Sequence, residues 1–428
     1  MKLPQWLDTS SAVKILWANS GGLLPLDRGG KIRSFNIARE LARRHEVGLF
    51  IFYPRMAPDP HEQLRDFFAT VECLPLDLPG RTSFGDMLAY AANAVTARPY
   101  QMRKYCRPAA RQRLRELLRH GEYDVLLCDF LDTAGVVPWE LGVPTVIFTH
   151  NVEAVIWKRH FEVSRNPLWK VIAWREYRTM DRAERRFTKM ADHVLTVSDE
   201  DRRAFLEFLP EEKVTTVPTG VDLDYFKAPE TLECSHSLVF TGSMDWLPNE
   251  DGIVYFSTEI LPLIQQQIAD VTLSVVGRRP TRKLLALAEN NPAVRVTGAV
   301  DDIRPYIRKA GVYVVPLRIG GGTRIKIFEA MAMGCAVVST TVGAEGLPVR
   351  HGENILLADS PEDFAAQTIA LLRQSAVRER IGRAARRLVE SHYGWPEVTD
   401  VLEKVLKQVA ASSSSRESVR ATEKISCY

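Results

Sequence analysis

Cysteines, long apolar runs and an excess of one charge are all scarce in this sequence of 428 residues. Its six cysteines stand singly, which excludes a disulfide framework and a cysteine zinc site: Cys73, Cys106, Cys128, Cys234, Cys335 and Cys427. No apolar run reaches the roughly 18 to 20 residues of a membrane span, and the N-terminal stretch lacks the order of a signal peptide. We therefore expect a cytoplasmic protein with reduced thiols.

The charges nearly balance, because 56 basic and 53 acidic residues leave a formal net charge of +3. Overall charge therefore indicates no partner, and without a recognition module we expect no nucleic acid. Neither G-x-x-x-x-G-K-S/T nor G-x-G-x-x-G occurs in the chain. Their absence argues against ordinary P-loop hydrolases and nicotinamide dehydrogenases.

Short apolar runs alternate with helical patterns throughout the chain. In the first half the runs span 13–19, 47–53, 125–130, 144–150, 193–198 and 213–218. In the second half they span 238–242, 271–277, 294–298, 312–317, 335–340 and 354–359. This alternation predicts an α/β protein with two Rossmann-like, doubly wound parallel sheets that face each other across a cleft.

The domain limits follow from where these patterns stop. We expect an N-terminal domain over residues 1–217, a C-terminal domain over 238–394, and between them a linker over 218–237 that is rich in turn formers. Apolar residues at helical spacing predict an amphipathic helix over 395–410 that packs back toward the N-terminal domain. The polar stretch 411–428 is predicted to be disordered.

The stretch IGGGTRIKIFEAMAMG (319–334) carries the strongest local signal. Gly320–Gly322 precede Thr323, a suitable N-cap for a helix that Gly334 would end. Arg324 and Lys326 then fall in the first turn, where each cation opposes the helix dipole by about 0.3–1 kcal/mol. A bound phosphate or diphosphate would reverse that cost. The alternative is that both side chains point to water and that Lys326 pairs with a glutamate three residues later.

Other glycines lie where ligands bind in parallel sheets, beyond the carboxyl ends of predicted strands. Gly29 and Gly30 follow the first strand of the chain. Strands of the second half are closed by Gly242 and Ser243, by Gly277 and Arg278, and by Gly298.

An ordered set of segments makes a resemblance specific. In the second half these are GSMDWLPNEDGIVYF (242–256), VVGRRP (275–280), VTGAVDDIRPYI (296–307) and the long stretch 315–347. In the first half they are DRGGKIRSFNIARELARRHEV (27–47), THNVEA (149–154) and VPTGVDLDYF (217–226). Together they resemble the retaining group 1 glycosyltransferases of family 4, which have the GT-B fold, over about residues 13–400.

The resemblance implies roles in binding the donor. Glu329 matches the second glutamate of the family's E-x7-E motif, which accepts hydrogen bonds from the ribose of a nucleotide sugar. Arg324 and Lys326 would hold the diphosphate. Main-chain groups from Gly298 to Val300 would meet the base.

It also implies roles for the first domain, which would lie on the acceptor side. Gly29 and Gly30 match the glycine-rich turn whose backbone approaches the phosphates. His150 matches the histidine beside the transferred sugar. A histidine at a strand end would otherwise be taken as a structural residue.

Two departures from the family pattern concern the donor site. Gly321 replaces the first glutamate of E-x7-E, so contacts to the sugar hydroxyls would come from backbone amides of Gly320 to Thr323 or from elsewhere. Ser243 stands at the family's arginine position, and its lysine region reads LPNEDG. We infer that Arg278 shares the neutralisation of the diphosphate with Arg324 and Lys326.

Two stretches combine basic and aromatic residues, at 98–119 and 157–178. Such a surface suits an anionic bilayer or a lipid-phosphate acceptor and would place the protein peripherally on the inner face of the cell membrane. The alternative is a solvated helix face whose arginines pair with neighbouring acids.

The resemblance implies a retaining, metal-independent hexosyltransferase that uses a nucleotide-diphosphate sugar as co-substrate and needs no cofactor. Its acceptor would be a glycan or a lipid-linked or polysaccharide intermediate. The D-x-D at Asp222 and Asp224 is assigned to structure rather than to a metal site. Two alternatives stay open: a nucleotide-sugar 2-epimerase of the same architecture and a non-catalytic nucleotide-sugar sensor.

Overall fold

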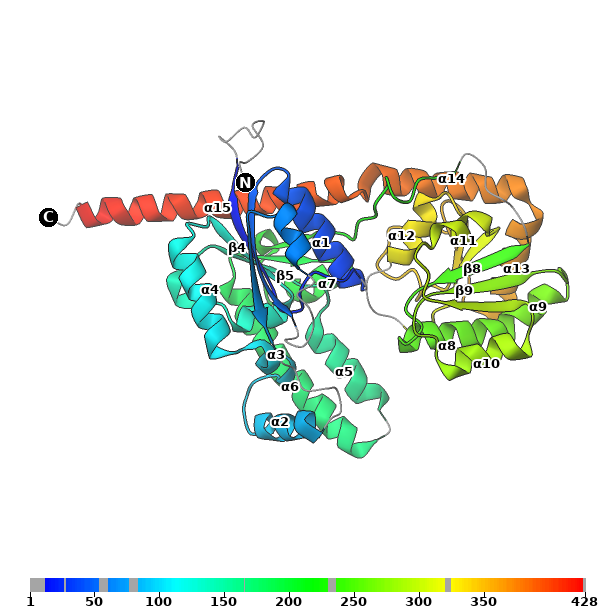
Figure 1. Cartoon of the computed structure of the whole chain (residues 1–428), viewed down its shortest axis with the longest axis horizontal. Coiled ribbons are helices and arrows are strands. Elements are labelled where there is room, and N and C mark those ends of the chain that lie inside the picture. The colour runs from blue at the N-terminus through cyan, green and yellow to red at the C-terminus, as the bar shows by residue number, and fades with distance from the viewer. Residues whose placement is uncertain are drawn as a thin grey trace. The chain divides into compact units, whose positions relative to one another are not determined.

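The computed structural model describes residues 12–26, 28–53, 61–76, 84–164, 166–229, 236–319 and 325–425. The chain divides into two compact units, Met1–Pro218 with Val398–Tyr428 and Thr219–Glu397. Each unit is built on one parallel sheet with helices on its faces (Figure 1). The predicted α/β class with two Rossmann-like sheets is confirmed.

The first unit has a seven-stranded sheet in the order β3-β2-β1-β4-β5-β6-β7. The strands are β1 (Lys14–Asn19), β2 (Glu46–Tyr53), β3 (Thr70–Pro75), β4 (Val125–Asp129), β5 (Thr145–Phe148), β6 (His193–Thr196) and β7 (Val214–Thr216). Strand order reverses between β1 and β4, where Asn19 lies opposite Asp129 in the register. Ligands of open parallel sheets bind at such a reversal, beyond the carboxyl ends of the strands.

Helices cover both faces of this sheet, with α1 and α4 on opposite sides (Figure 1). They are α1 (Gly29–Ala42), α2 (Phe84–Ala94), α3 (Tyr100–Tyr105), α4 (Pro108–His120), α5 (Glu153–Val163), α6 (Pro167–Met190) and α7 (Asp199–Leu206), with short 3-10 turns η1 (Glu62–Asp66), η2 (Leu131–Gly135), η3 (Trp139–Leu141) and η4 (Glu211–Lys213). Leu114 and Leu118 of α4 pack onto Phe50 and Leu126 of the sheet. Because both faces are covered, the strands are continuous apolar runs.

The second unit has a six-stranded sheet in the order β10-β9-β8-β11-β12-β13. The strands are β8 (Ser237–Thr241), β9 (Thr272–Val276), β10 (Val294–Gly298), β11 (Val312–Val315), β12 (Val337–Ser339) and β13 (Leu356–Leu357). Its helices are α8 (Leu247–Tyr255), continued by a π-helical turn η5 (Phe256–Ile260) and α9 (Leu261–Gln265), then α10 (Arg282–Asn290), α11 (Arg304–Lys309), α12 (Ile325–Ala332), α13 (Pro361–Arg373) and α14 (Ser375–His392). Figure 1 shows α8 and α10 on one side of this sheet and α11 and α12 on the other.

The start of the predicted linker belongs to the second unit. The Val221 amide donates to the Tyr393 carbonyl over 2.7 Å, and Phe226 is buried. Asp222 accepts hydrogen bonds from the amides of Asp224 and Tyr225, so this D-x-D segment closes a local turn. Turn formers dominate the composition of this stretch, yet its few apolar residues still pack.

The C-terminal helix α15 (Trp395–Ile425) is longer than the sequence analysis expects. Val398, Leu402 and Leu406 are buried, and Arg44 of α1's trailing loop pairs with Glu403 at 2.7 Å. Residues 411–425, for which the composition predicts disorder, continue this helix. The physical reason is that extending an existing helix adds one hydrogen bond per residue without a new nucleation cost.

Candidate active site

The first cluster of predicted residues surrounds His150, just beyond the end of β5. Only 4% of His150 is exposed, and its Nε2 lies 2.7 Å from Oδ1 of the fully buried Asp129. Asp129 ends β4, the strand that pairs with β5 in parallel register. Adjacent parallel strands end at one edge of the sheet, which is why two residues 21 positions apart in the chain meet here.

Asp129 fixes the protonation of His150. Its second oxygen accepts hydrogen bonds from Trp17 Nε1 at 3.1 Å and Asn19 Nδ2 at 2.5 Å. Burial acts to raise the pKa of Asp129, but His150 and the donated hydrogen bonds outweigh it and hold that pKa below its usual value. Burial also lowers the pKa of His150 against the opposing effect of Asp129. The hydrogen bond to the Asp129 carboxylate places an imidazole proton on Nε2, and Nδ1 has no hydrogen-bond partner among the described residues.

The ring of His150 is held by its neighbours on both sides. Phe130 stacks on it at a centroid distance of 3.8 Å and adopts a left-handed backbone with φ of +67°, which is strained for an aromatic residue. A Cβ atom on Gly30 would lie 2.9 Å from the Phe130 ring and 3.7 Å from His150 Nδ1. Gly30 thus lets the first turn of α1, which starts at Gly29, approach the free nitrogen.

A buried cation lies one turn further along α1. The Arg33 guanidinium is fully buried, lies 4.3 Å from the Phe148 ring and donates through Nη2 to the Val217 carbonyl. Its Nε and Nη1 have no hydrogen-bond partner among the described residues. Burial lowers the pKa of Arg33 to about 9, and the charge of Asp129 opposes that shift. Two unsatisfied donors on a buried cation are costly unless an anion or polar ligand meets them.

Carboxyl groups line the same edge of the first sheet. Asp132 accepts from Gln101 Nε2 at 2.9 Å through one oxygen, and its other oxygen has no partner among the described residues. Burial raises the pKa of Asp132 to about 6 and that of Glu153 to about 7. Glu184 of α6 accepts from the Glu153 and Ala154 amides, so it caps α5. Polar, partly unsatisfied groups therefore lie beside His150, where a hydroxylated ligand can bind.

In the second unit, three predicted glycines are joined by backbone hydrogen bonds beyond the strand ends. The Gly242 amide donates to Val276 and the Gly277 amide to Gly298. A Cβ on Gly277 would lie 1.7 Å from the Gly242 carbonyl oxygen, so no side chain fits there. Gly298 has a φ of +73°, the left-handed region that favours glycine. These residues form a flat backbone floor at the carboxyl edge.

Ser243 and Arg278 lie over this floor in one chain of hydrogen bonds. Arg278 Nε donates to Ser243 Oγ at 3.2 Å, and Ser243 Oγ donates to Asp245 Oδ1 at 2.6 Å. Arg279 pairs with the other oxygen of Asp245 at 3.3 Å. The serine that replaces the family's arginine is thus hydrogen-bonded to a nearby arginine, and a role of Arg278 in neutralising a diphosphate stays a prediction.

Lys326, in the first turn of α12, points toward Gly242 at the carboxyl edge of the second sheet. Its Nζ donates to Asn249 Oδ1 at 2.8 Å and lies 4.1 Å from the centroid of the Phe240 ring. A Cβ on Gly242 would come within 2.9 Å of that ammonium group. The lysine is half-buried and does not simply point to water. Neutral groups hold the cation at a helix N-terminus where an anion is stabilised.

Glu329 lies one turn further along α12 and is half-buried. Burial raises its pKa to about 7, against the opposing effect of Lys326. Burial, with the charge of Glu329 as a smaller cause, raises the pKa of Tyr313, whose hydroxyl lies 2.6 Å from Thr241 Oγ1. Val300 is half-buried and packs against the core of this unit. The remaining predicted site residues, Gly320, Gly321, Gly322, Thr323 and Arg324, lie outside the described residues.

Sequence reasoning overlooked several residues of these clusters, and three of them differ in the signal that they carry. Asp129 had a usable signal, because it is the one acid that ends an otherwise apolar strand run, VLLCDF. Asn249 lies in the LPNEDG segment, which stands where the family has a lysine, so the family pattern gives its amide no role. Arg33 had no signal, because its burial depends on how α1 packs against β5.

Two family models match this chain in sequence. Residues 28–225 match the model described as Glycosyltransferase Family 4, and residues 235–374 match the model described as Glycosyl transferases group 1. The two segments cover most of both units, including His150, Lys326 and Glu329.

Individual proteins of known name and solved structures are also similar to this chain. Phosphatidyl-myo-inositol mannosyltransferase from Mycobacterium tuberculosis is 28% identical over 324 residues, which is 72% of this chain and 79% of the mycobacterial protein. Sucrose-phosphate synthase from Thermosynechococcus elongatus superposes with a TM-score of 0.69 at 19% identity, over 93% of this chain and 100% of that one. HepE from Anabaena, solved in complex with UDP and glucose, has a TM-score of 0.63 at 15% identity, over 92% of this chain and 99% of that one. At these identities the solved structures show the shared fold.

Proposed function

The chain is a glycosyltransferase that belongs to family 4, and on that premise we propose that it moves a hexosyl group from a nucleotide-diphosphate sugar to a lipid-linked or polysaccharide intermediate with retention of configuration. The second unit would bind the donor and the first the acceptor. The proposed setting is the inner face of the cell membrane. Support for a nucleotide donor comes from HepE, whose structures are described with UDP and with UDP-glucose.

The observation that carries the proposal is the position of Lys326. A cation in the first turn of a helix, held by Asn249 and Phe240 and close to Gly242, meets the requirements of a diphosphate site. Arg278 would add a second positive charge, and Arg324 a third. Glu329 would accept hydrogen bonds from the ribose hydroxyls.

The rate acceleration would come from charge that is in place before the reaction. The departing diphosphate gains negative charge as the bond to the sugar breaks, and Lys326 with its helix N-terminus would stabilise it. The sugar develops oxocarbenium character at the same time. His150 Nδ1 would accept a hydrogen bond from a hydroxyl of that sugar, because Asp129 keeps the proton on Nε2. The proposed step needs neither a metal nor a further cofactor.

A donor panel tests the proposal. The full chain is incubated with UDP-, GDP- and ADP-sugars plus lipid-linked acceptors, and nucleotide release and glycosylated product are followed together. The expected result is release of one nucleotide in proportion to product, and its loss in Lys326→Met. Lys283→Met, at an exposed lysine on α10, is the matched control and should keep full activity.

Other outcomes would contradict transfer and point elsewhere. An isomerised donor sugar without nucleotide release would identify an epimerase. Tight nucleotide binding with no turnover on any acceptor would identify a sensor.

A further inference from the structure

Helix α2 has its polar side turned inward and its apolar side turned outward. Asp86, Tyr90 and Asn93, spaced along one face, contact the protein: Asp86 accepts from the Tyr100 hydroxyl at 2.7 Å, and Asn93 donates to the Arg98 carbonyl at 2.9 Å. On the opposite face Phe84 is 76% exposed and Met87 64%, with Leu88 beside them at 56%. A surface helix of a soluble protein normally shows the reverse pattern.

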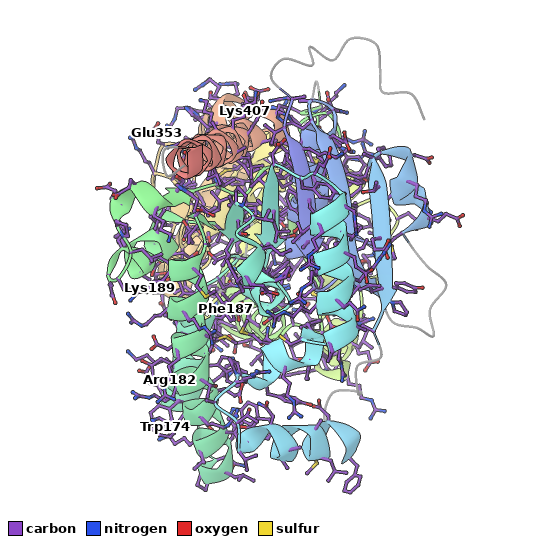
Figure 2. All side chains as sticks on the ribbon, turned by 90° about the vertical axis from the view of Figure 1, so that its left-hand side faces the viewer. Trp174, Arg182, Phe187, Lys189, Glu353 and Lys407 are labelled. Carbon is purple, nitrogen blue, oxygen red and sulfur yellow. The ribbon has the colours of Figure 1, made fainter. Side chains whose placement is uncertain are left out.

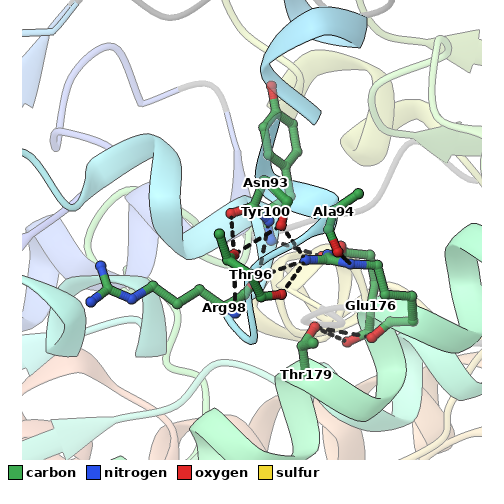
Figure 3. Close-up of polar contacts among 8 residues, drawn as sticks. Asn93, Ala94, Thr96, Arg98, Tyr100, Glu176 and Thr179 are labelled. Atoms are coloured by element: carbon green, nitrogen blue, oxygen red, sulfur yellow. Dashed lines mark hydrogen bonds and ion pairs between the residues drawn. The ribbon is translucent and has the colours of Figure 1, made fainter. Parts of the chain in front are cut away.

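This helix is fixed to α6 rather than loosely attached. The Arg175 guanidinium of α6 donates to the carbonyl oxygens of Asn93, in the last turn of α2, at 2.6 Å and of Thr96, just beyond the helix, at 2.9 Å, as part of the network in Figure 3. Arg175 also lies 5.6 Å from the Tyr90 ring. The outward apolar face is therefore a built feature, because a network of buried polar groups holds it in that orientation.

The first turns of α6 extend the exposed apolar surface. Leu168 is 69% exposed, and Val171 and Trp174 follow it at helical spacing with 65% and 51%. Trp174 lies toward one end of α6 and Lys189 toward the other (Figure 2). Figures 1 and 2 agree that α2 lies beside the Trp174 end, away from the sheet. We call the six exposed side chains of the two helices the apolar tip: Phe84, Met87, Leu88, Leu168, Val171 and Trp174.

Positive charge borders the apolar tip. Lys170, Arg178 and Arg182 are exposed along α6, and Arg182 is visible between Trp174 and Lys189 in Figure 2. Among the described residues neither Arg178 nor Arg182 has a carboxylate within ion-pair distance. By contrast, three arginines of α4 pair with carboxylates: Arg113 lies 2.7 Å from Glu72, and Arg111 and Arg115 both pair with Glu140. For these arginines of the basic stretch 98–119 the structure shows the pairing with neighbouring acids that the sequence analysis gave as its alternative.

We propose that the apolar tip inserts into the headgroup region of an anionic bilayer, with the basic residues of α6 at the level of the lipid phosphates. Exposed apolar side chains next to tryptophan and unpaired cations match the chemistry of that interface. A second copy of this chain fits worse, because it would bring the same cations together. The proposal names the partner surface of the proposed transferase, but it does not require turnover.

Flotation with lipid vesicles tests it on the full chain, without any donor. The probes are vesicles of phosphatidylcholine alone and with added phosphatidylglycerol, at low and high salt. We expect the protein to float with the anionic vesicles at low salt and less at high salt. No flotation with anionic vesicles at low salt would overturn the proposal.

Two variants locate the binding surface. Phe84→Ser with Leu88→Ser should lower the partition coefficient on the order of tenfold, because two apolar side chains lose their burial. Arg178→Gln with Arg182→Gln should lower it on anionic vesicles and flatten the salt dependence. The matched controls are Leu285→Ser and the pair Arg282→Gln and Lys283→Gln, all exposed on α10. Equal losses in test and control variants would contradict the proposal.

A spectroscopic readout covers the case of a poorly folded variant. Brominated lipids should quench the fluorescence of the wild-type chain, and Trp174→Phe should lose part of that quenching with an unchanged thermal transition. Quenching that Trp174→Phe leaves intact would contradict insertion at this point. So would a dimer in sedimentation that Phe84→Ser converts to a monomer without any change in flotation. A protein that floats but transfers no sugar would count against the proposed transfer alone.

Discussion

The site residues of the two units differ in how deeply they are buried and in which groups they contact. In the first unit His150 is buried, and its partner Asp129 receives further hydrogen bonds from Trp17 and Asn19. In the second unit Lys326 and Glu329 are half-buried, and the lysine ammonium donates to Asn249 and lies over the Phe240 ring. The first arrangement fixes a proton and a ring orientation. The second leaves a cation and a carboxyl group partly exposed, as expected where a charged ligand binds and is released.

The largest effect is expected where the fixed proton is disturbed. In Asp129→Asn the new amide would donate to His150 Nε2 and move the imidazole proton to Nδ1, so that the free lone pair is lost. We expect a fall in kcat of about 100-fold with donor affinity nearly unchanged. Steady-state kinetics and a nucleotide titration measure the two quantities. His150→Asn is the companion variant, and a double variant no worse than either single one would show that the pair acts as a unit. An unchanged kcat in Asp129→Asn would contradict the role of Asp129 in fixing the His150 proton.

The next largest effect is expected from the loss of the Lys326 charge. Lys326→Met should weaken UDP binding by about 10- to 100-fold, because a charge-assisted hydrogen bond contributes about 1.5–3 kcal/mol. Calorimetric titration of the wild type, of Lys326→Met and of the exposed Lys283→Met measures this. Equal affinities for all three would remove Lys326 from the donor site.

A pH dependence should follow from Glu329. With a pKa of about 7 in the folded protein, the carboxylate that would accept ribose hydroxyls forms as the pH rises from about 6 to 8, so UDP should bind several-fold more tightly. The folded pKa lies above the ordinary value of 4.5, so the free protein loses stability as the pH rises from about 4.5 to 7, and little more at higher pH. Glu329→Gln should flatten both profiles, and it controls for ionisation of the nucleotide. An identical slope in this variant would exclude Glu329 as the titrating group.

The smallest effect tests the backbone floor. Gly298→Ala forces a residue with a Cβ into the left-handed region, although the space around it is open. We expect a loss of about 1–2 kcal/mol in the free energy of unfolding, seen as a lower Tm by calorimetry. Gly352→Ala, at a similar φ of +77° in open space, should cost the same in stability but leave UDP binding unchanged. A larger loss of UDP affinity in Gly298→Ala would assign that glycine to the ligand.

Sequence alone determined the class of fold and singled out most of the candidate residues of the second unit. Apolar runs alternating with helical patterns predict parallel sheets because buried strands and covering helices differ in period. Two local effects allow the candidate residues to be recognised in the sequence. Little space at a strand end favours glycine, as at 242, 277 and 298, and the dipole of a single helix makes the cation at Lys326 unusual. The prediction of disorder for residues 411–428 rests on composition alone. Composition does not take into account that the preceding residues already form the helix α15, which continues to Ile425.

Tertiary structure decided what depends on residues distant in the chain. Asp129 becomes the partner of His150 only because β4 and β5 are neighbours in the sheet. Arg33 becomes a buried cation only because α1 packs on the face that carries Phe148. The outward face of α2 is apolar in any sequence plot, but such a stripe normally marks the buried side. Only the network around Arg175, which turns Asp86, Tyr90 and Asn93 inward, decides that here the apolar side faces out.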